Sequence, residues 1–207
     1  EELYISLATR KEYLIEVFEA QCDIALQNLE LMRQAVQDNV DIVFITGTDF
    51  GAQRNLLIPP DTYREVFKPF HKRMNDWVHR KTSWKTFIHS CGSVEPLIDD
   101  FIEAGFDILN PVQTAAARME PAHLKNTYGD RIAFWGGGVD TQRTLPFGTP
   151  DEVRREVQQR LEVFGAGGGF VFNAVHNVQA GVPIENLLAM FDAFKECNEV
   201  QGVVRNG

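Results

Sequence analysis

A histidine and a cysteine separated by one residue form the most chemically specific feature of the sequence. His89 and Cys91 follow a predicted strand at 85–89, and alternate residues of an extended segment point the same way. An imidazole nitrogen and a thiolate that converge in this way are typical ligands of Zn²⁺, which keeps an open fourth position when the site is catalytic. The alternative interpretation is a small buried thiol beside a hydrogen-bonded histidine, since an isolated H-x-C pair carries little weight.

His176 and Asp49 are the candidates to complete such a site. His176 follows the last predicted strand; it is a third metal ligand, a general acid or base, or a histidine bonded to a backbone carbonyl. Asp49 follows the first strand; it can ligate a metal, hold a ligand histidine, pair with a cationic substrate or form an Asx turn beside Gly51. We expect both residues to be catalytic and His176 also to bind the metal.

The elements that position these residues alternate between strands and helices. Apolar runs predict strands at 41–46, 85–89, 106–110, 132–135 and 169–173. Segments with helical periodicity or helix-start signals lie at 10–40, 60–80, 94–104, 121–128, 150–164 and 183–199. Thr149 and Pro150 begin one helix with a capping hydroxyl and a proline suited to the first turn. This alternation indicates an α/β protein with a parallel sheet.

Polar residues or tight turns end each of the five strands, which favours a (β/α)₈ TIM-type barrel. In such a barrel the site is built from the carboxyl ends of several strands, whereas a doubly wound sheet uses one switch point. Asn110, Asp140 and Asn173 stand at or just beyond strand ends, with Gln113 close by, and we expect these four residues to bind substrate. Five βα units do not close an eight-stranded barrel, so we predict an incomplete barrel in a single domain, 1–207.

The composition excludes several classes of partner. The chain has 207 residues, 44% of them hydrophobic and 24% charged, with a net charge of −9. An acidic surface repels phosphate backbones and anionic membranes, so we expect no nucleic-acid or membrane partner. Three cysteines without framework spacing fit a reducing compartment, and no signal-peptide pattern opens the sequence. We therefore predict a cytoplasmic protein.

A series of short motifs, in order along about three quarters of the chain, is shared with one known superfamily. The motifs are Thr48–Gly51, Ile58–Pro60, Lys68–Pro69, His89–Gly92, Asp107–Gln113, Phe134–Asp140, Leu145–Pro150, His176–Gln179 and Pro183–Asn186. In these stretches the chain resembles the uroporphyrinogen decarboxylase superfamily, which includes zinc-dependent corrinoid methyltransferases. The resemblance implies a (β/α)₈ barrel with its site at the carboxyl ends of the strands.

The methyltransferase branch is the one we prefer. Its members bind zinc with an H-x-C pair and a later cysteine, and the metal activates a thiol that accepts a methyl group from a corrinoid protein. This chain keeps the pair as His89 and Cys91, and His176 stands where the later cysteine would fall. Imidazole can replace thiolate as a zinc ligand, with less negative charge on the metal. The resemblance thus implies Zn²⁺ on His89, Cys91 and His176, a corrinoid partner protein and a small-molecule substrate.

Two alternatives remain open. The decarboxylases of porphyrin biosynthesis need no cofactor and hold the carboxylates of their substrate with an N-terminal arginine-rich motif. This chain reproduces their late asparagine and histidine as Asn173 and His176 but has no such arginine-rich segment; Arg54, Arg118 and Arg143 are the cations near its strand ends. The other alternative is a catalytically inactive remnant that binds a ligand or a corrinoid partner.

The family barrel also has strands where this chain has only a helix before Asp41. An open parallel sheet with an uncovered edge promotes association with other chains. We therefore expect a homo-oligomer, or a sheet that another chain completes.

Overall fold

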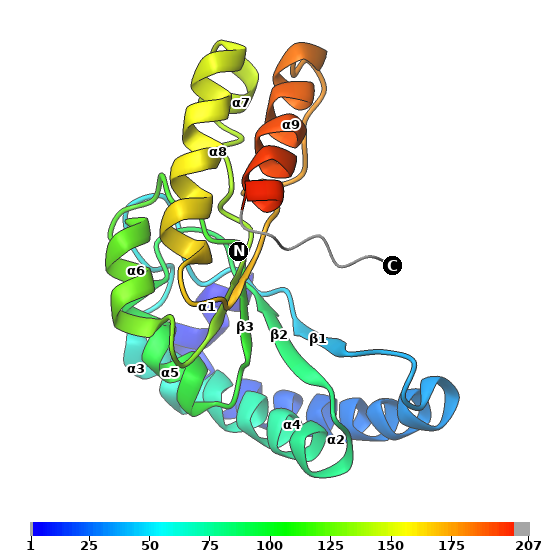
Figure 1. Cartoon of the computed structure of the whole chain (residues 1–207). Helices are drawn as coiled ribbons and strands as arrows, with labels where there is room; N and C mark the ends of the chain where they lie inside the picture. Colours follow the sequence, from blue (N-terminus) through cyan, green and yellow to red (C-terminus); the bar gives the residue numbers. More distant parts are fainter. Residues whose placement is uncertain (1, 201–207) are drawn as a thin grey trace. The chain divides into compact units, whose positions relative to one another are not determined.

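The chain folds into two compact units in the computed structural model, which describes residues 2–200, with side chains through residue 198. Unit 1 extends to Leu109 and unit 2 begins at Asn110. Both units combine parallel strands with helices, so the predicted α/β class is confirmed (Figure 1). The prediction of a single domain over 1–207 stays a prediction.

Unit 1 contains the first two strands and the helices that pack on them. Strand β1 (Ile42–Thr46) pairs in parallel with β2 (Lys85–His89), with Ile42 opposite Lys85. In order along the chain, the remaining elements are α1 (Glu2–Thr9), α2 (Lys11–Val36), α3 (Pro60–Thr62), a π-helical turn (Tyr63–Phe67), α4 (Lys68–Lys81), a 3₁₀ turn (Glu95–Leu97) and α5 (Ile98–Glu103). Strand β3 (Ile108–Asn110) follows α5 and leads into unit 2.

The core of unit 1 lies between β1 and the helices α2 and α4 (Figure 1). Leu29 of α2, Val43 of β1, Val78 of α4 and Trp84 form a buried apolar cluster. Alternation along β1 places Val43 in this cluster, because successive side chains of a strand point to opposite faces. The cluster therefore fixes which side chains at the end of β1 face the helices.

A second, aromatic cluster lies beneath the loop that follows β1. The buried Phe50 ring packs against the rings of Tyr63 and Phe67, with centroid separations of 5.0 and 5.1 Å. The Tyr63 hydroxyl shares a hydrogen bond of 3.0 Å with Nδ1 of His71. Burial lowers the pKa of His71 to about 4, so this histidine is neutral at physiological pH. Phe50 therefore anchors the loop in a buried aromatic cluster.

The π-helical turn before α4 has a local cause. Pro69 has no N–H to donate to the carbonyl four residues earlier, and its ring crowds that carbonyl. The backbone widens, and the Lys68 N–H donates instead to the carbonyl of Tyr63, five residues back. This turn presents Arg64 and Lys68 to Asp100 of α5, whose buried carboxylate accepts hydrogen bonds from both. The two cations hold the pKa of Asp100 below its usual value despite burial, which raises it.

Unit 2 contains two strands and a pair of long helices. Strand β4 (Ala133–Trp135) pairs in parallel with β5 (Phe170–Val171), with Phe134 opposite Phe170. Helices α8 (Pro150–Gly165) and α9 (Ile184–Val200) lie side by side (Figure 1) and bury residues such as Val153, Val157 and Met190 between them. The remaining helices are α6 (Pro121–Tyr128) and α7 (Thr144–Phe147). Among the described residues, no helix has the length and apolar character needed to cross a membrane.

Most predicted elements occur, with informative differences. The helical segment predicted over 10–40, as one helix or a bent pair, is the single helix α2, which ends at Val36, and the unpredicted helix α1 precedes it. Strands β3 and β5 are shorter than predicted. Helix α7 was not predicted, because it is only four residues long and part of its stabilisation comes from a residue distant in sequence. The Asp140 carboxylate accepts from the backbone N–H groups of Gln142 and Arg143 before α7, and Asn186 of α9 donates to carbonyls at Leu145 and Gly148.

The buried His71 predicts how stability depends on pH. In the unfolded chain a histidine takes up a proton below about pH 6.5, whereas folded His71 does so only near pH 4. The unfolded state therefore binds more protons in this interval, and the free energy of unfolding should fall by roughly 3 kcal/mol as the pH decreases through it. Urea denaturation at pH 7.0 and 4.5 measures the effect. The His71→Asn variant, which keeps a polar partner for Tyr63, should lose most of this dependence, and His123→Asn should retain it.

Candidate metal site

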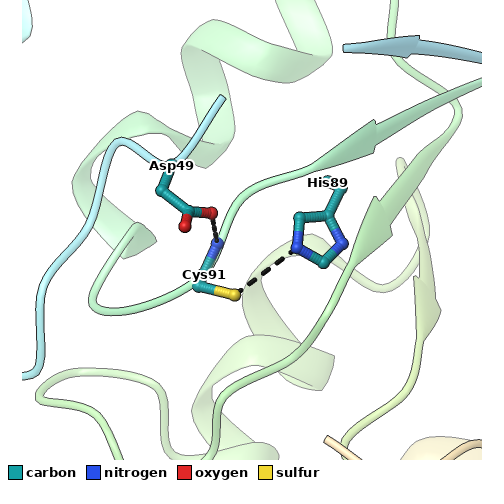
Figure 2. Close-up of side chains that lie close together, drawn as sticks. All are labelled: Asp49, His89 and Cys91. Atoms are coloured by element: carbon teal, nitrogen blue, oxygen red, sulfur yellow. Dashed lines mark hydrogen bonds between the residues drawn. The ribbon is translucent and has the colours of Figure 1, made fainter. Parts of the chain in front are cut away.

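Three potential metal ligands lie together where β1 and β2 end. The ligand atoms of Asp49, His89 and Cys91 all lie within 4.8 Å of one another. Nε2 of His89 is 3.5 Å from Sγ of Cys91, and the backbone N–H of Cys91 donates a hydrogen bond of 2.8 Å to Oδ1 of Asp49. Figure 2 shows the carboxylate and the imidazole on either side of the cysteine. The predicted convergence of His89 and Cys91 is thus observed, with Asp49 as its neighbour.

Two glycines bring the loops that carry these residues into direct backbone contact. Gly92, which follows Cys91, has a φ of +88°, and a Cβ there would overlap the carbonyl of Gly51. Conversely, a Cβ on Gly51 would lie 2.7 Å from both the carbonyl oxygen of Cys91 and the nitrogen of Ser93. The Ser93 N–H donates to the Ala52 carbonyl across this contact at 2.8 Å. Only residues without side chains allow such an approach.

Ser90 provides a second link between the two loops. Its fully buried hydroxyl accepts a hydrogen bond of 2.9 Å from the backbone N–H of Phe50, the residue that anchors the first loop in the aromatic cluster. The Phe50 carbonyl in turn accepts from Leu57, which closes the loop on itself. Asp49 is therefore held on one side by Phe50 and on the other by Cys91.

The surroundings of Cys91 disfavour a thiolate in the absence of a cation. Burial raises the pKa of the Cys91 thiol, and the charge and hydrogen bonding of Asp49 raise it further, to about 11. A thiol with this pKa is protonated at neutral pH. A bound divalent cation would favour the thiolate form of Cys91, because the positive charge stabilises the sulfur anion and the proton passes to the solvent. The negative Asp49 would then stabilise the cation.

The spacing of the donors fits a tetrahedral zinc ion. Zinc binds sulfur at about 2.3 Å and imidazole nitrogen at about 2.0 Å, and at a tetrahedral angle these two donors stand about 3.5 Å apart. The Sγ to Nε2 separation in this chain is 3.5 Å. Nitrogen, sulfur and carboxylate oxygen are also the donor set that zinc uses in proteins. The residues present therefore fit the metal that the sequence predicts.

The other predicted catalytic and metal ligand, His176, belongs to unit 2. It lies in the segment between β5 and α9 and its side chain is exposed. The cluster formed by Asp49, His89 and Cys91 lies in unit 1 and does not include it. A role for His176 as a ligand or as an acid or base stays a prediction.

The four predicted substrate-binding residues have varied surroundings in unit 2. Asn110 is buried and donates a hydrogen bond of 2.9 Å to the carbonyl of Trp135, and Asp140 is buried and caps the turn before α7. Gln113 is half-buried. Asn173 is exposed, and its backbone carbonyl accepts from Gly138. Asn110 and Asp140 thus stabilise the fold, and substrate binding by all four stays a prediction.

Sequence reasoning missed the residues that hold the loops together. Gly51 and Gly92 were noted only as neighbours of Asp49 and Cys91, and Ser90 was given no role. Their sequence signal was the pair of tight polar turns after successive strands. Parallel strands end at the same edge of a sheet, which places such turns side by side.

The sequence is similar to those of several known proteins. The sequence pattern described as "Uroporphyrinogen decarboxylase (URO-D)" matches residues 13–197. A uroporphyrinogen decarboxylase of Pseudoalteromonas atlantica is 28% identical over 185 residues, covering 81% of this chain and 48% of that protein. The methylcobamide:CoM methyltransferase MtaA of Methanosarcina barkeri is 26% identical over 182 residues, covering 87% of this chain and 49% of that protein.

The fold itself matches a solved structure. A methyltransferase from Methanosarcina mazei superposes with a TM-score of 0.60 at 22% identity, covering 90% of this chain and 53% of that one. The likeness supports the predicted incomplete barrel type, with strands β1 to β5 as its part of the sheet. The chain spans about half the length of these three relatives.

The glycine contact predicts a graded set of stability losses. Gly92→Ala combines a strained φ with a backbone overlap, Gly51→Ala has the overlap alone, and Gly167→Ala has a φ of +72° with nothing nearby. A left-handed alanine costs about 1 to 2 kcal/mol, so Gly167→Ala should lose that much and Gly92→Ala clearly more. Urea unfolding measures all three. Equal losses for Gly92→Ala and Gly167→Ala would contradict the close approach.

The Asp49 carboxylate predicts the reactivity of Cys91. Asp49→Asn keeps an acceptor for the Cys91 N–H but removes the charge, so the pKa of the thiol should fall. A lower pKa increases the thiolate fraction at pH 8, so alkylation by iodoacetamide should become faster, on the order of a few-fold. Peptide mass spectrometry follows Cys91 directly, and Cys197 in the same protein serves as the reference. An unchanged rate ratio would show that Asp49 exerts no electrostatic effect on the thiol.

Proposed function

Because the chain belongs to the uroporphyrinogen decarboxylase family, we propose that it acts in the manner of the zinc-dependent methyltransferases. In this proposal it moves a methyl group between a corrinoid protein and a thiol or similar small acceptor. The observation that carries the proposal is the group of Asp49, His89 and Cys91, whose donor types and spacing suit zinc. The active enzyme would be cytoplasmic.

Each residue has a distinct part in the proposal. His89 and Cys91 hold the zinc ion, Asp49 completes or supports the coordination, and His176 of unit 2 supplies a further ligand or handles a proton. Zinc, when bound, stabilises a thiolate at neutral pH. The chain itself partly buries Cys91 and fixes the cysteine backbone through Asp49. Asn110, Gln113, Asp140 and Asn173 are proposed to contact the substrate.

The relatives support this choice but also favour an alternative. Methanosarcina barkeri MtaA is named for methyl transfer from a methylcobamide to CoM, which is the class of reaction proposed here. The Pseudoalteromonas atlantica relative is named a uroporphyrinogen decarboxylase and matches nearly as much of the chain. In that alternative no metal is needed, Asp49 and His176 handle protons, and Arg54, Arg118 and Arg143 contact an acidic porphyrinogen. A ligand-binding remnant would bind either partner without turnover.

Cobalt substitution tests the metal site independently of catalysis. Protein prepared without chelators should bind close to one Co²⁺ or Zn²⁺ per chain, and cobalt should give a near-ultraviolet sulfur-to-metal absorption band. Cys91→Ser should abolish the band and strongly weaken binding, because a hydroxyl is a poor zinc ligand at neutral pH. His176→Ala should weaken binding while leaving the band in place if His176 is a ligand.

Cys197→Ser is the matched control, because Cys197 lies on α9 outside the cluster, and it should bind metal like the unaltered chain. Metal content near zero in the unaltered chain, or binding unaffected by Cys91→Ser, would contradict the zinc site. Release of carboxylate groups from a porphyrinogen by metal-free protein would establish the decarboxylase alternative instead.

A further inference from the structure

A polar cavity in unit 2 lies between the turn before α7, helix α7 itself and helix α8. Its volume is about 670 Å³, which is within the range of small-molecule sites, roughly 300 to 1,000 Å³. The residues of its wall all belong to unit 2, and unit 1 contributes none of them. The wall includes three arginines, three carboxylates and one aromatic ring: Arg143, Arg155, Arg160, Asp140, Glu152, Glu156 and Phe147.

The three carboxylates of this wall are engaged in local structure. Asp140 accepts from two backbone N–H groups before α7. Glu152 accepts from the backbone N–H and the hydroxyl of Thr149 at the start of α8, and Glu156 accepts from the backbone N–H of Asp140. Among residues 2–198, the ligand group that converges closely enough to hold a metal is the one in unit 1. The carboxylates of the cavity are therefore structural and do not form a cation site.

The arginines of the wall, in contrast, retain unused donors. Arg160 donates one hydrogen bond of 3.1 Å to Glu156, and its buried Nε has no hydrogen-bond partner in the part of the chain that the structure describes. Within the same residues, the guanidinium groups of Arg143 and Arg155 make neither a hydrogen bond nor an ion pair. A buried donor without an acceptor is unfavourable and uncommon. The cavity thus presents guanidinium donors that the described protein acceptors do not use.

Guanidinium groups of this kind select a particular class of anion. Each one is a permanently charged planar fork that binds a carboxylate or a phosphate through two parallel hydrogen bonds. A carboxylate has two oxygens and is used up by one fork, whereas the three terminal oxygens of a phosphate monoester can accept from more than one. In the chain alone, the three carboxylates of the wall offset the three positive charges, so the arginines can share one cavity. A phosphate is therefore the anion that suits the set best.

The aromatic ring of the wall indicates what the phosphate is attached to. Phe147, at the end of α7, is 85% exposed and is the most exposed large apolar side chain in the described part of the chain. An isolated exposed ring needs no explanation, but this ring shares a cavity with three arginines. Aromatic rings pack on other rings, and guanidinium planes stack on them as well. A ligand with a planar ring would cover Phe147 while its anionic group contacts the arginines.

We propose that this cavity binds a phosphate monoester whose organic part is an aromatic ring or a nucleoside. The phosphate oxygens accept hydrogen bonds from the guanidinium groups of Arg155 and Arg160, and Arg143 contributes a third positive charge. The ring of the ligand packs against Phe147. This inference goes beyond the proposed function, because it uses residues of unit 2 and neither the metal cluster nor methyl transfer. Its failure would leave the zinc hypothesis intact.

Isothermal titration calorimetry with four probes tests the proposal: AMP, phenyl phosphate, adenosine and inorganic phosphate. At least one of the two monoesters should bind once per chain and at least tenfold more tightly than adenosine or inorganic phosphate, because a monoester alone contacts both the arginines and the ring. Tight binding of AMP alone would identify a nucleoside phosphate, and equal binding of both monoesters would identify the aromatic ring. The proposal is overturned if neither monoester binds at millimolar concentration, or if inorganic phosphate or adenosine binds as tightly as they do.

Variants of exposed wall residues locate the binding. Arg155→Gln should weaken binding of the monoester by about tenfold, the loss expected for a hydrogen bond to a charged group. Phe147→Ala should weaken binding of the monoester and leave that of inorganic phosphate unchanged. Arg131→Gln is the matched control, because it removes the same charge from unit 2 outside the cavity, and it should bind like the unaltered chain. Circular dichroism verifies that each variant is folded. Equal losses for Arg155→Gln and Arg131→Gln would overturn the proposal, since they would show a general effect of charge.

Discussion

The backbone contact between Gly51 and Gly92 is the constraint on which the candidate site depends. It allows the loop after β1 and the loop after β2 to approach closely enough for Asp49 to accept from the Cys91 N–H. Any side chain at either position would separate the loops and remove Asp49 from the pair formed by His89 and Cys91. The aromatic cluster beneath Phe50 then keeps the first loop from moving away, so the site is preorganised by packing on one side and by hydrogen bonds on the other.

The same packing explains the electrostatic character of the site. Partial burial and the nearby carboxylate keep the Cys91 thiol protonated without a cation, although the donor atoms already have the separation that zinc requires. A site of this kind favours a doubly charged ion, because the metal turns the unfavourable proximity of the thiol and the carboxylate into a stabilising one. The relatives include one protein named as a decarboxylase and one named as a methyltransferase, and the donor set of this chain is one that zinc uses in proteins.

The elements of the chain differ in how completely their apolar side chains are buried. Helix α8 has one apolar stripe and a charged outer surface, as expected for a helix between core and solvent. Helices α2 and α9 and strand β1 carry apolar side chains on surfaces that the described residues do not cover.

The amino-acid pattern by itself determined the alternation of strands and helices, the barrel type and the proximity of His89 to Cys91. The alternation follows from local periodicity, and the proximity follows from two residues that are two apart at one strand end. The barrel type followed from the polar ends of the five strands and from the family resemblance. Helix α7 and the position of Asp49 depend on contacts between distant residues: Asn186 with the carbonyls at Leu145 and Gly148, Ser90 with Phe50, and Gly51 with Gly92. No local signal specifies such contacts, because their free energy exists only once packing has brought the separate segments together.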